Sequence, residues 1–193
     1  MFSIVMKWIG TIATILSVPA SIYFFVQFKR HRKTISWKKV KKGAHQLIKT
    51  VKEVNPDLII TFSGRGAIFA NLIITELDNK YPVYTCLLNN KSNDTFLRPQ
   101  TWSEFETSKW IGYIPDEILN YTNKKILVID DITRSGETIE KLTELLIRHG
   151  STPKNIFSMS LMANEDVLIR CRIPQYYWKI INTIEFTMPW ESK

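Results

Sequence analysis

Residue types that build cross-links and metal centres are scarce in this chain. It has two cysteines, Cys86 and Cys171, no C-x-x-C motif, and three histidines that stand far apart in the sequence. Two cysteines build neither a disulfide framework nor a cysteine-based zinc site, and cysteines this isolated are typical of a reducing compartment. The scattered histidines argue against a His-rich metal site. A disulfide-stapled fold and a zinc domain are therefore excluded.

Acidic residues are missing from the first 42 positions, which carry nine lysines and arginines. The rest of the 193-residue chain holds 17 basic and 18 acidic side chains, so the formal charge of +8 belongs to the N-terminal end. Nucleic-acid binding needs a basic stripe on the folded domain itself, and this distribution argues against nucleic acid as a partner. Because 45% of the residues are hydrophobic and 23% are charged, one compact domain is expected.

Charged residues are also absent from Trp8 to Phe28, a run of 21 positions. A helix of this length spans about 31 Å, close to the roughly 30 Å of a bilayer's hydrocarbon core. A cleavable signal peptide with a cut near Val18-Pro19-Ala20 is the alternative, but the apolar run exceeds the usual 7–15 residues and continues through Ile22–Phe28. We therefore predict a transmembrane anchor and basic juxtamembrane segment over residues 1–34, contacting the lipid bilayer through residues 8–28.

The flanks of this run predict its orientation. One lysine precedes it, whereas Lys29, Arg30, Arg32 and Lys33 follow it. By the positive-inside rule, a single-pass protein with this asymmetry has its C-terminal domain in the cytoplasm.

Beyond the anchor, helical and strand patterns alternate. Helices are expected over residues 36–54, 67–78 and 136–149, and strands over residues 58–62, 83–88, 126–129, 156–162 and 176–181. Short, uninterrupted apolar strands separated by helices indicate a parallel sheet covered on both faces. Residues 35–193 are therefore predicted to form one α/β domain. Residues 89–115 show no sustained periodicity, and a loop this long inside a compact domain is expected to be either functional or disordered.

The most specific motif spans residues 126–138. The apolar stretch Ile126–Ile129 ends at Asp130 and Asp131, and a turn rich in threonine, serine and glycine then opens into a helix. Backbone N–H groups at a helix start, together with hydroxyl groups, suit a phosphate monoester, and paired carboxylates suit vicinal hydroxyls. In parallel sheets, ligands bind beyond the carboxyl ends of the strands. An ordinary strand–helix turn with an acidic cap is the simpler alternative.

This motif resembles the signature with which type I phosphoribosyltransferases bind 5-phosphoribosyl 1-diphosphate (PRPP). The signature is an apolar strand, two acids and a small-residue turn that ends in Thr-Gly-x-Thr or its serine equivalent. Residues 35–60 with the following turn at 63–67, and the Pro-Trp-acid tail at 189–191, resemble xanthine-guanine phosphoribosyltransferase-like proteins. The resemblance covers roughly residues 35–191.

The resemblance implies the type I phosphoribosyltransferase fold: a parallel sheet flanked by helices, with a small hood. It also implies Mg²⁺ as cofactor, PRPP and a nucleobase-like molecule as partners, and residues 89–115 as a lid that excludes water. Asp130 and Asp131 would bind the ribose hydroxyls, directly or through the metal. The expected site residues are Asp130, Asp131 and Arg134 for catalysis, Thr133, Ser135, Gly136, Glu137 and Thr138 for the 5′-phosphate, Ser63, Gly64, Arg65 and Gly66 for the pyrophosphate, and Phe186 for the base. A homodimer is left open.

Three features depart from the family pattern, the first being Ala67 where a second glycine is common. Arg134 stands where 6-oxopurine enzymes usually carry an acid near the attacking purine nitrogen, and a guanidinium cannot accept a proton. The expected strand Phe157–Met162 contains no lysine, which those enzymes use to read the purine oxo group.

Two functions therefore stay open. The first, which we favour, is a membrane-anchored, Mg²⁺-dependent phosphoribosyltransferase that converts PRPP and a purine-like base to a nucleoside monophosphate and pyrophosphate. The second is a catalytically diverged regulator or effector that binds PRPP or a nucleotide at the membrane. A scaffold that uses the fold only as a platform is a weaker third possibility.

Overall fold

The computed structural model describes residues 33–93, 98–182 and 186–191. The chain divides into a small unit, residues 1–36 with 185–193, and a large unit, residues 37–184. In the small unit, β1 (Lys33–Thr34) pairs in parallel with β9 (Phe186–Thr187), and the Ile35 N–H donates to the Thr187 carbonyl at 3.0 Å. The predicted anchor at residues 8–28 lies outside the described residues. Within the part of the chain that is described, no helix has the length and apolar character to cross a membrane.

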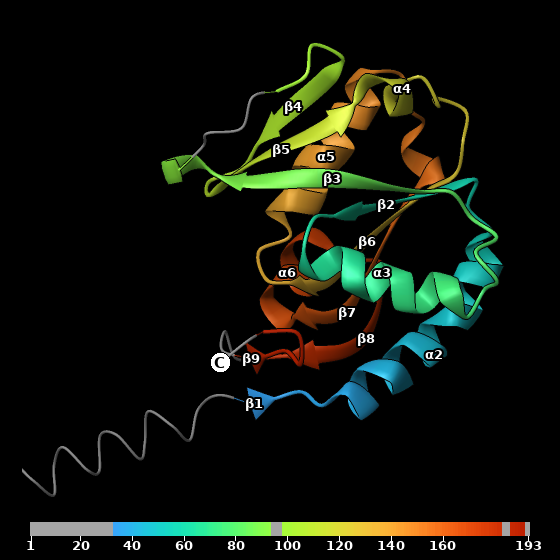
Figure 1. Ribbon diagram of the computed structural model, residues 1–193, viewed down its shortest axis with the longest axis vertical. Coiled ribbons are helices and arrows are strands. Elements are labelled where there is room, and N and C mark those ends of the chain that lie inside the picture. The colour runs from blue at the N-terminus through green and yellow to red at the C-terminus, as the bar shows by residue number, and fades with distance from the viewer. Residues whose placement is uncertain (1–32, 94–97, 183–185, 192–193) are drawn as a thin grey trace, which may run out of the picture. The chain divides into compact units, whose positions relative to one another are not determined.

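The large unit is built on a seven-stranded sheet with the strand order β4-β5-β3-β2-β6-β7-β8 (Figure 1). Its strands are β2 (Leu58–Phe62), β3 (Val83–Asn90), β4 (Trp102–Glu106), β5 (Trp110–Pro115), β6 (Ile126–Thr133), β7 (Ile156–Asn164) and β8 (Tyr176–Ile181). The five strands β3, β2, β6, β7 and β8 run parallel, and β5 and β4 continue the sheet in antiparallel fashion. The predicted α/β fold is confirmed, with a sheet that is mostly rather than wholly parallel.

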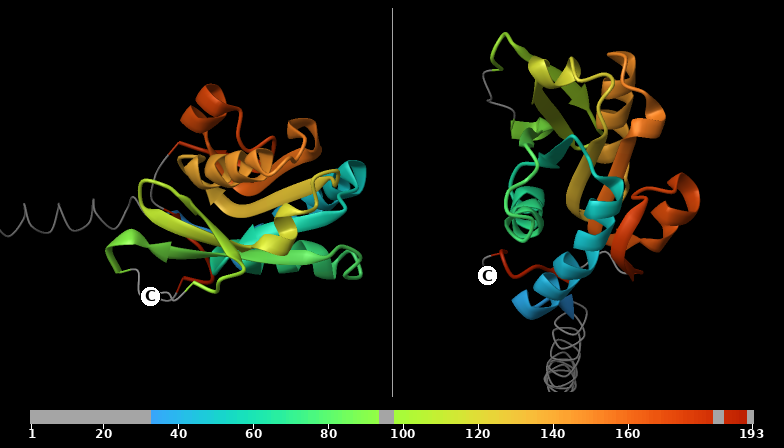
Figure 2. Two further views of the ribbon diagram at one scale, coloured as in Figure 1. Left: turned by 90° about the horizontal axis from the view of Figure 1, so that it is seen from above. Right: turned by 90° about the vertical axis from the view of Figure 1, so that its right-hand side faces the viewer.

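Helices cover both faces of this sheet (Figure 2). They are α2 (Trp37–Val54), α3 (Arg65–Thr75), α4 (Asp116–Leu119), α5 (Glu137–Arg148) and α6 (Glu165–Cys171), with single 3₁₀ turns at Lys91–Asn93 and Pro153–Asn155. Apolar residues of α5 pack on the face that includes Ile60 and Val128, while α3 packs against β2 and β6 and α2 against β7 and β8. Because both faces are covered, β2 is buried at every position, and its one polar residue, Thr61, donates its hydroxyl to the Ile129 carbonyl at 3.0 Å.

The prediction of a structureless loop over residues 89–115 is wrong. Most of this segment forms the β4–β5 hairpin, which joins the sheet by pairing β5 with β3, Leu87 facing Tyr113. Only one residue of β4, Phe105, is buried, so the strand lacks a regular alternation of apolar and polar residues. Edge strands of this kind leave a weak pattern in the sequence.

The strand predicted to end at Ile129 continues to Thr133. Its parallel pairing with β7 extends past the two acids, with Ile132 opposite Met162 and Thr133 opposite Ala163. Charge alone therefore does not end β6, because the neighbouring strand still satisfies its backbone groups. Since β2 and β6 are parallel neighbours, with Thr61 opposite Ile129, the segments that follow them emerge at the same edge of the sheet.

Candidate active site

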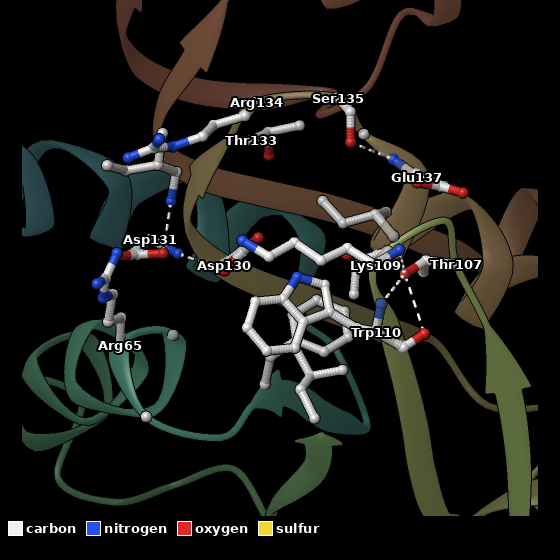
Figure 3. Close-up of a pocket in the computed structure, with 18 of the residues that line it drawn as sticks. Arg65, Thr107, Lys109, Trp110, Asp130, Asp131, Thr133, Arg134, Ser135 and Glu137 are labelled. Atoms are coloured by element: carbon white, nitrogen blue, oxygen red, sulfur yellow. Dashed lines mark hydrogen bonds between the residues drawn. The ribbon is translucent and has the colours of Figure 1, made fainter. Parts of the chain in front are cut away.

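A pocket of about 610 Å³ lies at the carboxyl ends of β2 and β6 (Figure 3). Three segments line it: residues 62–66 after β2, residues 107–110 between β4 and β5, and residues 130–139 from β6 into α5. The structure thus brings together all the predicted site residues except Phe186. That residue lies in β9 of the small unit, where its backbone pairs with Lys33, and its role toward a base stays a prediction.

The paired acids form the buried part of the pocket. The Asp131 N–H donates to Asp130 Oδ1 at 2.8 Å, and the Ile132 N–H donates to Asp131 Oδ1 at 2.8 Å. Asp131 is only 7% exposed, and its Oδ2 has no hydrogen-bond partner. A buried carboxylate oxygen left unsatisfied is costly and fits a ligand hydroxyl or a cation. We therefore expect the ligand to complete the bonding of Asp131.

Burial raises the pKa of both carboxyls. For Asp130 the negative charge of Asp131 raises the pKa further, whereas for Asp131 the hydrogen bond from Ile132 and the charges of Arg65 and Arg134 partly offset burial. Like charges this close cannot both ionise without cost. The pair therefore holds a proton more readily than ordinary carboxyls, and a bound cation would favour its release.

The two carboxylates also suit magnesium. Mg²⁺ usually binds one or two protein carboxylates and completes its shell with water and substrate phosphate oxygens. Among the described residues, no cluster of three or more histidine, cysteine or acidic side chains could hold a metal by itself. The site therefore fits a metal that arrives with a phosphorylated substrate.

The turn after β6 forms the start of α5. Gly136 has a φ of +77° and immediately precedes the first helical residue, Glu137. The Ser135 hydroxyl accepts from the Glu137 N–H at 3.4 Å. Free N–H groups at a helix start favour an anion, which agrees with the predicted phosphate site. Thr133 also lines the pocket, and its buried hydroxyl bonds to the Ser160 hydroxyl on β7 at 2.5 Å; its role toward the 5′-phosphate stays a prediction.

The turn after β2 is held against both neighbouring strands. The Ser63 hydroxyl accepts from the Leu88 N–H at 2.9 Å, and the Ser63 N–H donates to the Cys86 carbonyl at 2.7 Å. Gly64 has a φ of +77° and a ψ of −113°, which side chains disfavour. Gly66 is buried, and a Cβ there would lie 3.3 Å from Asp130 Oδ1. The small residue therefore lets α3 begin directly beside the acid pair.

Two arginines reach toward Asp131 from opposite walls of the pocket (Figure 3). Arg65 comes from the start of α3 and Arg134 from the turn after β6, and both lower the pKa of Asp131. The Arg134 side chain is exposed to solvent, and it lies close enough to Asp131 for its charge to act on that carboxyl.

Residues 107–110 form another wall of the pocket; they lie in the segment 89–115 that the resemblance implies as a lid, but none of them was predicted as a site residue. Ser108 donates to Glu137 twice, from its N–H to Oε1 and from its hydroxyl to Oε2, each at 2.6 Å. These bonds, the hydroxyl's foremost, lower the pKa of Glu137. The signal available in the sequence was weak: a Thr-Ser-Lys turn between two short strands, each of which begins with tryptophan.

An acid pair and two tight turns at the carboxyl edge of a mostly parallel sheet are typical of α/β proteins that bind phosphorylated sugars or nucleotides. Comparison with known families is more specific. The phosphoribosyl transferase domain matches residues 30–192, and the chain belongs to this family.

Three known proteins illustrate the range of relatives. The transcriptional regulator GfcR of Methanococcus maripaludis is 24% identical over 107 residues, which are 55% of this chain and 45% of that protein. The chain spans about half the length of the curated relatives it matches. The purine phosphoribosyltransferase of Pyrococcus horikoshii has a TM-score of 0.61 at 18% identity, over 84% of this chain and 95% of that one. The xanthine-guanine-hypoxanthine phosphoribosyltransferase of Helicobacter pylori has a TM-score of 0.58 at 17% identity, over 83% and 94%. At such identities the likeness shows the fold.

Proposed function

We propose that this chain binds PRPP and transfers its phosphoribosyl group to a purine-like nucleobase, giving a nucleoside monophosphate and pyrophosphate. The carrying observation is that one pocket joins the acid pair, the helix-start turn at residues 133–138 and the turn at residues 63–66. These three elements match the three parts of PRPP: ribose hydroxyls, 5′-phosphate and diphosphate. Family membership supports the same substrate.

Phosphoribosyl transfer requires that the protein bind the substrates and neutralise the charge of the diphosphate; it does not require a nucleophilic side chain. Transfer passes through an oxocarbenium-like sugar carbon, so the diphosphate must leave and the base must be aligned with C1. The carboxylates of Asp130 and Asp131 orient the ribose, the turn before α5 holds the 5′-phosphate, and Arg65 offsets diphosphate charge. Asp130 and Asp131 would hold magnesium, which would supply further neutralisation of charge on the leaving group.

A regulator that binds PRPP or a nucleotide without transfer is the second candidate, and Arg134 favours it. An arginine directed toward Asp131 offers no acceptor for a purine proton. β7 also lacks the lysine with which 6-oxopurine enzymes read the oxo group. A transcriptional regulator among the relatives supports this alternative.

One pair of measurements separates the two candidates. The full chain in detergent, with Mg²⁺ and PRPP, is assayed for pyrophosphate release across a panel of purine and pyrimidine bases, while calorimetry measures PRPP binding. Base-dependent pyrophosphate release supports the transferase. PRPP binding without release for any base leaves the regulator, and absence of PRPP binding contradicts both.

We also propose that residues 8–28 anchor the protein in a membrane, with the catalytic domain in the cytoplasm. The uncharged run and the basic flank that follows it support this placement. Assembly as a homodimer stays a prediction, which sedimentation of the detergent-solubilised chain would test.

A further inference from the structure

The turn between β4 and β5 is rigid and carries a lysine into the pocket. The Thr107 hydroxyl accepts from the Trp110 N–H at 2.7 Å and donates to the Trp110 carbonyl at 3.0 Å, and the Thr107 N–H donates to the same carbonyl at 2.9 Å. Thr107 is itself buried. Three bonds between the ends of a four-residue turn fix its backbone, so the residues at its tip have defined positions.

The tip of this turn is fastened to the other side of the pocket. Both oxygens of Glu137 accept from Ser108 at 2.6 Å, as described above. Glu137 is the first residue of α5, so the turn is bonded to the same helix start that is expected to hold the 5′-phosphate. Hydrogen bonds to an ionised carboxylate are stronger than neutral ones. The clasp therefore fixes the position of the following residue, Lys109, relative to the pocket.

Lys109 extends across the pocket above the indole of Trp110 (Figure 3). Its Nζ lies 5.0 Å from the centre of the Trp110 ring, a cation–π contact. No carboxylate of the described residues lies within 4.0 Å of this amine. By contrast, Lys91 at the end of β3 bonds to Glu106 at 2.7 Å. A cation held over an aromatic ring, without an acidic partner, is suited to bind an anionic group of a ligand.

The sheet order indicates which anionic group this is. The hairpin joins the sheet through β3, whose other neighbour is β2, the strand that leads into Ser63–Gly66. The Lys109 amine points toward the side of the pocket on which Arg65 lies (Figure 3). The 5′-phosphate has its own site at the start of α5. We propose that Lys109 binds the diphosphate of PRPP together with Arg65, and that the Ser108–Glu137 clasp positions it. This inference rests on the proposed function.

Three ligands test the assignment by calorimetry on the full chain in detergent with Mg²⁺: PRPP, pyrophosphate and ribose 5-phosphate, which lacks the diphosphate. Lys109→Met removes the charge and keeps the length of the side chain. We expect its affinities for PRPP and pyrophosphate to fall about 10- to 100-fold, as for loss of a hydrogen bond to a charged group, while ribose 5-phosphate affinity changes less than about twofold. Ser108→Ala, which loosens the clasp, should weaken PRPP binding in the same direction but less.

Lys124→Met is the matched control, because this variant also removes one positive charge. Lys124 pairs with Asp57 near the start of β6, at the end of the strand away from the pocket. It should bind all three ligands as the unaltered chain does. Equal losses for PRPP and ribose 5-phosphate in Lys109→Met, or no loss for either, would overturn the assignment of Lys109 while leaving PRPP binding intact. An unaltered chain that binds no PRPP would instead overturn the proposed function, and the inference with it.

Discussion

Asp130 and Asp131 show how a pair of site residues can lower the stability of the fold that positions them. Each carboxyl has a raised pKa because the chain buries it, and for Asp130 the charge of its neighbour adds to this. A carboxyl whose pKa is higher in the folded than in the unfolded state binds protons preferentially when folded. Its contribution to stability is therefore lost as pH rises from about 3.8 through the raised folded value.

Asp130→Asn tests this directly. The amide oxygen retains an acceptor for the Asp131 N–H, while the buried charge and the repulsion disappear. Without Mg²⁺ or PRPP, we expect the variant to have a higher free energy of unfolding than the unaltered chain at neutral pH, because its folded state no longer holds a buried charge beside Asp131. The gain should vanish as pH falls toward 4. Denaturant unfolding at several pH values measures it.

Asp57→Asn supplies the opposite case. The hydrogen bond from the Lys125 N–H lowers the pKa of Asp57, so this carboxylate stabilises the fold above its unfolded pKa of about 3.8. Asp57→Asn should therefore not raise the free energy of unfolding at neutral pH. If Asp130→Asn lowered stability there as well, the carboxyl at position 130 would not be held in an unfavourable charged state. Calorimetry should show loss of PRPP binding only for Asp130→Asn.

At the scale of elements, the buried parallel strands were the most predictable part of the fold. β2, which is buried at every position, was predicted with the bounds that the structure shows, 58–62, and the apolar stretch predicted as a strand over residues 126–129 lies in β6, which continues through the two acids to Thr133. The local sequence predicts these segments, because a strand buried on both faces is nearly all apolar and the turn that follows it is rich in small polar residues. The residues of each strand were therefore sufficient to predict it.

The position of the β4–β5 hairpin could not be predicted in this way. β5 owes its position to pairing with β3, a partner distant in sequence, and Ser108 meets Glu137 across 29 positions. Such contacts exist only after the chain has folded, so periodicity and motif spacing contain little trace of them.

The two glycines around the start of α3 serve different purposes, and their alanine variants should differ accordingly. Gly64 has open space around it but a backbone conformation that alanine disfavours. We expect Gly64→Ala to lower the free energy of unfolding by about 1–3 kcal/mol. At Gly66 the backbone is ordinary, but an added Cβ would lie 3.2 Å from Thr61 Oγ1 and 3.3 Å from Asp130 Oδ1.

Gly66→Ala should therefore cost PRPP affinity more than stability, because Asp130 must shift to accommodate the methyl group. Denaturant unfolding and calorimetry on both variants measure the two effects. A Gly64→Ala protein as stable as the unaltered chain would mean that the turn after β2 does not depend on this conformation.

At the scale of the whole molecule, the net charge does not show where the basic side chains lie. The chain beyond residue 42 holds nearly equal numbers of acidic and basic residues, yet the pocket walls carry Arg65, Lys109 and Arg134. Those cations suit a ligand with several negative charges and form no stripe that would follow a nucleic-acid backbone. The charge of the chain therefore indicates a binding partner only when the positions of the charged side chains in the fold are known.

The basic excess lies in the N-terminal 42 residues, and its meaning depends on the uncharged run at residues 8–28. If that run spans a membrane, the full chain should sediment with membranes and resist alkaline carbonate extraction. A C-terminal tag should be protected from protease in intact cells. Leu16→Arg, at the centre of the run, should release part of the protein, since an arginine there costs about 2.5–3.5 kcal/mol of insertion. Lys38→Gln, beyond the run, is the control and should leave the distribution unchanged.

The mass of the purified protein distinguishes the anchor from a signal peptide. An anchored chain keeps its N-terminal run, whereas cleavage near Ala20 would shorten the chain by about 20 residues and release the domain on the far side of the membrane. A shortened chain would thus contradict the anchor and the cytoplasmic orientation together. An intact chain with a protease-accessible C-terminal tag would contradict the orientation alone, because it would show that the four basic residues at 29–33 do not remain on the cytoplasmic side.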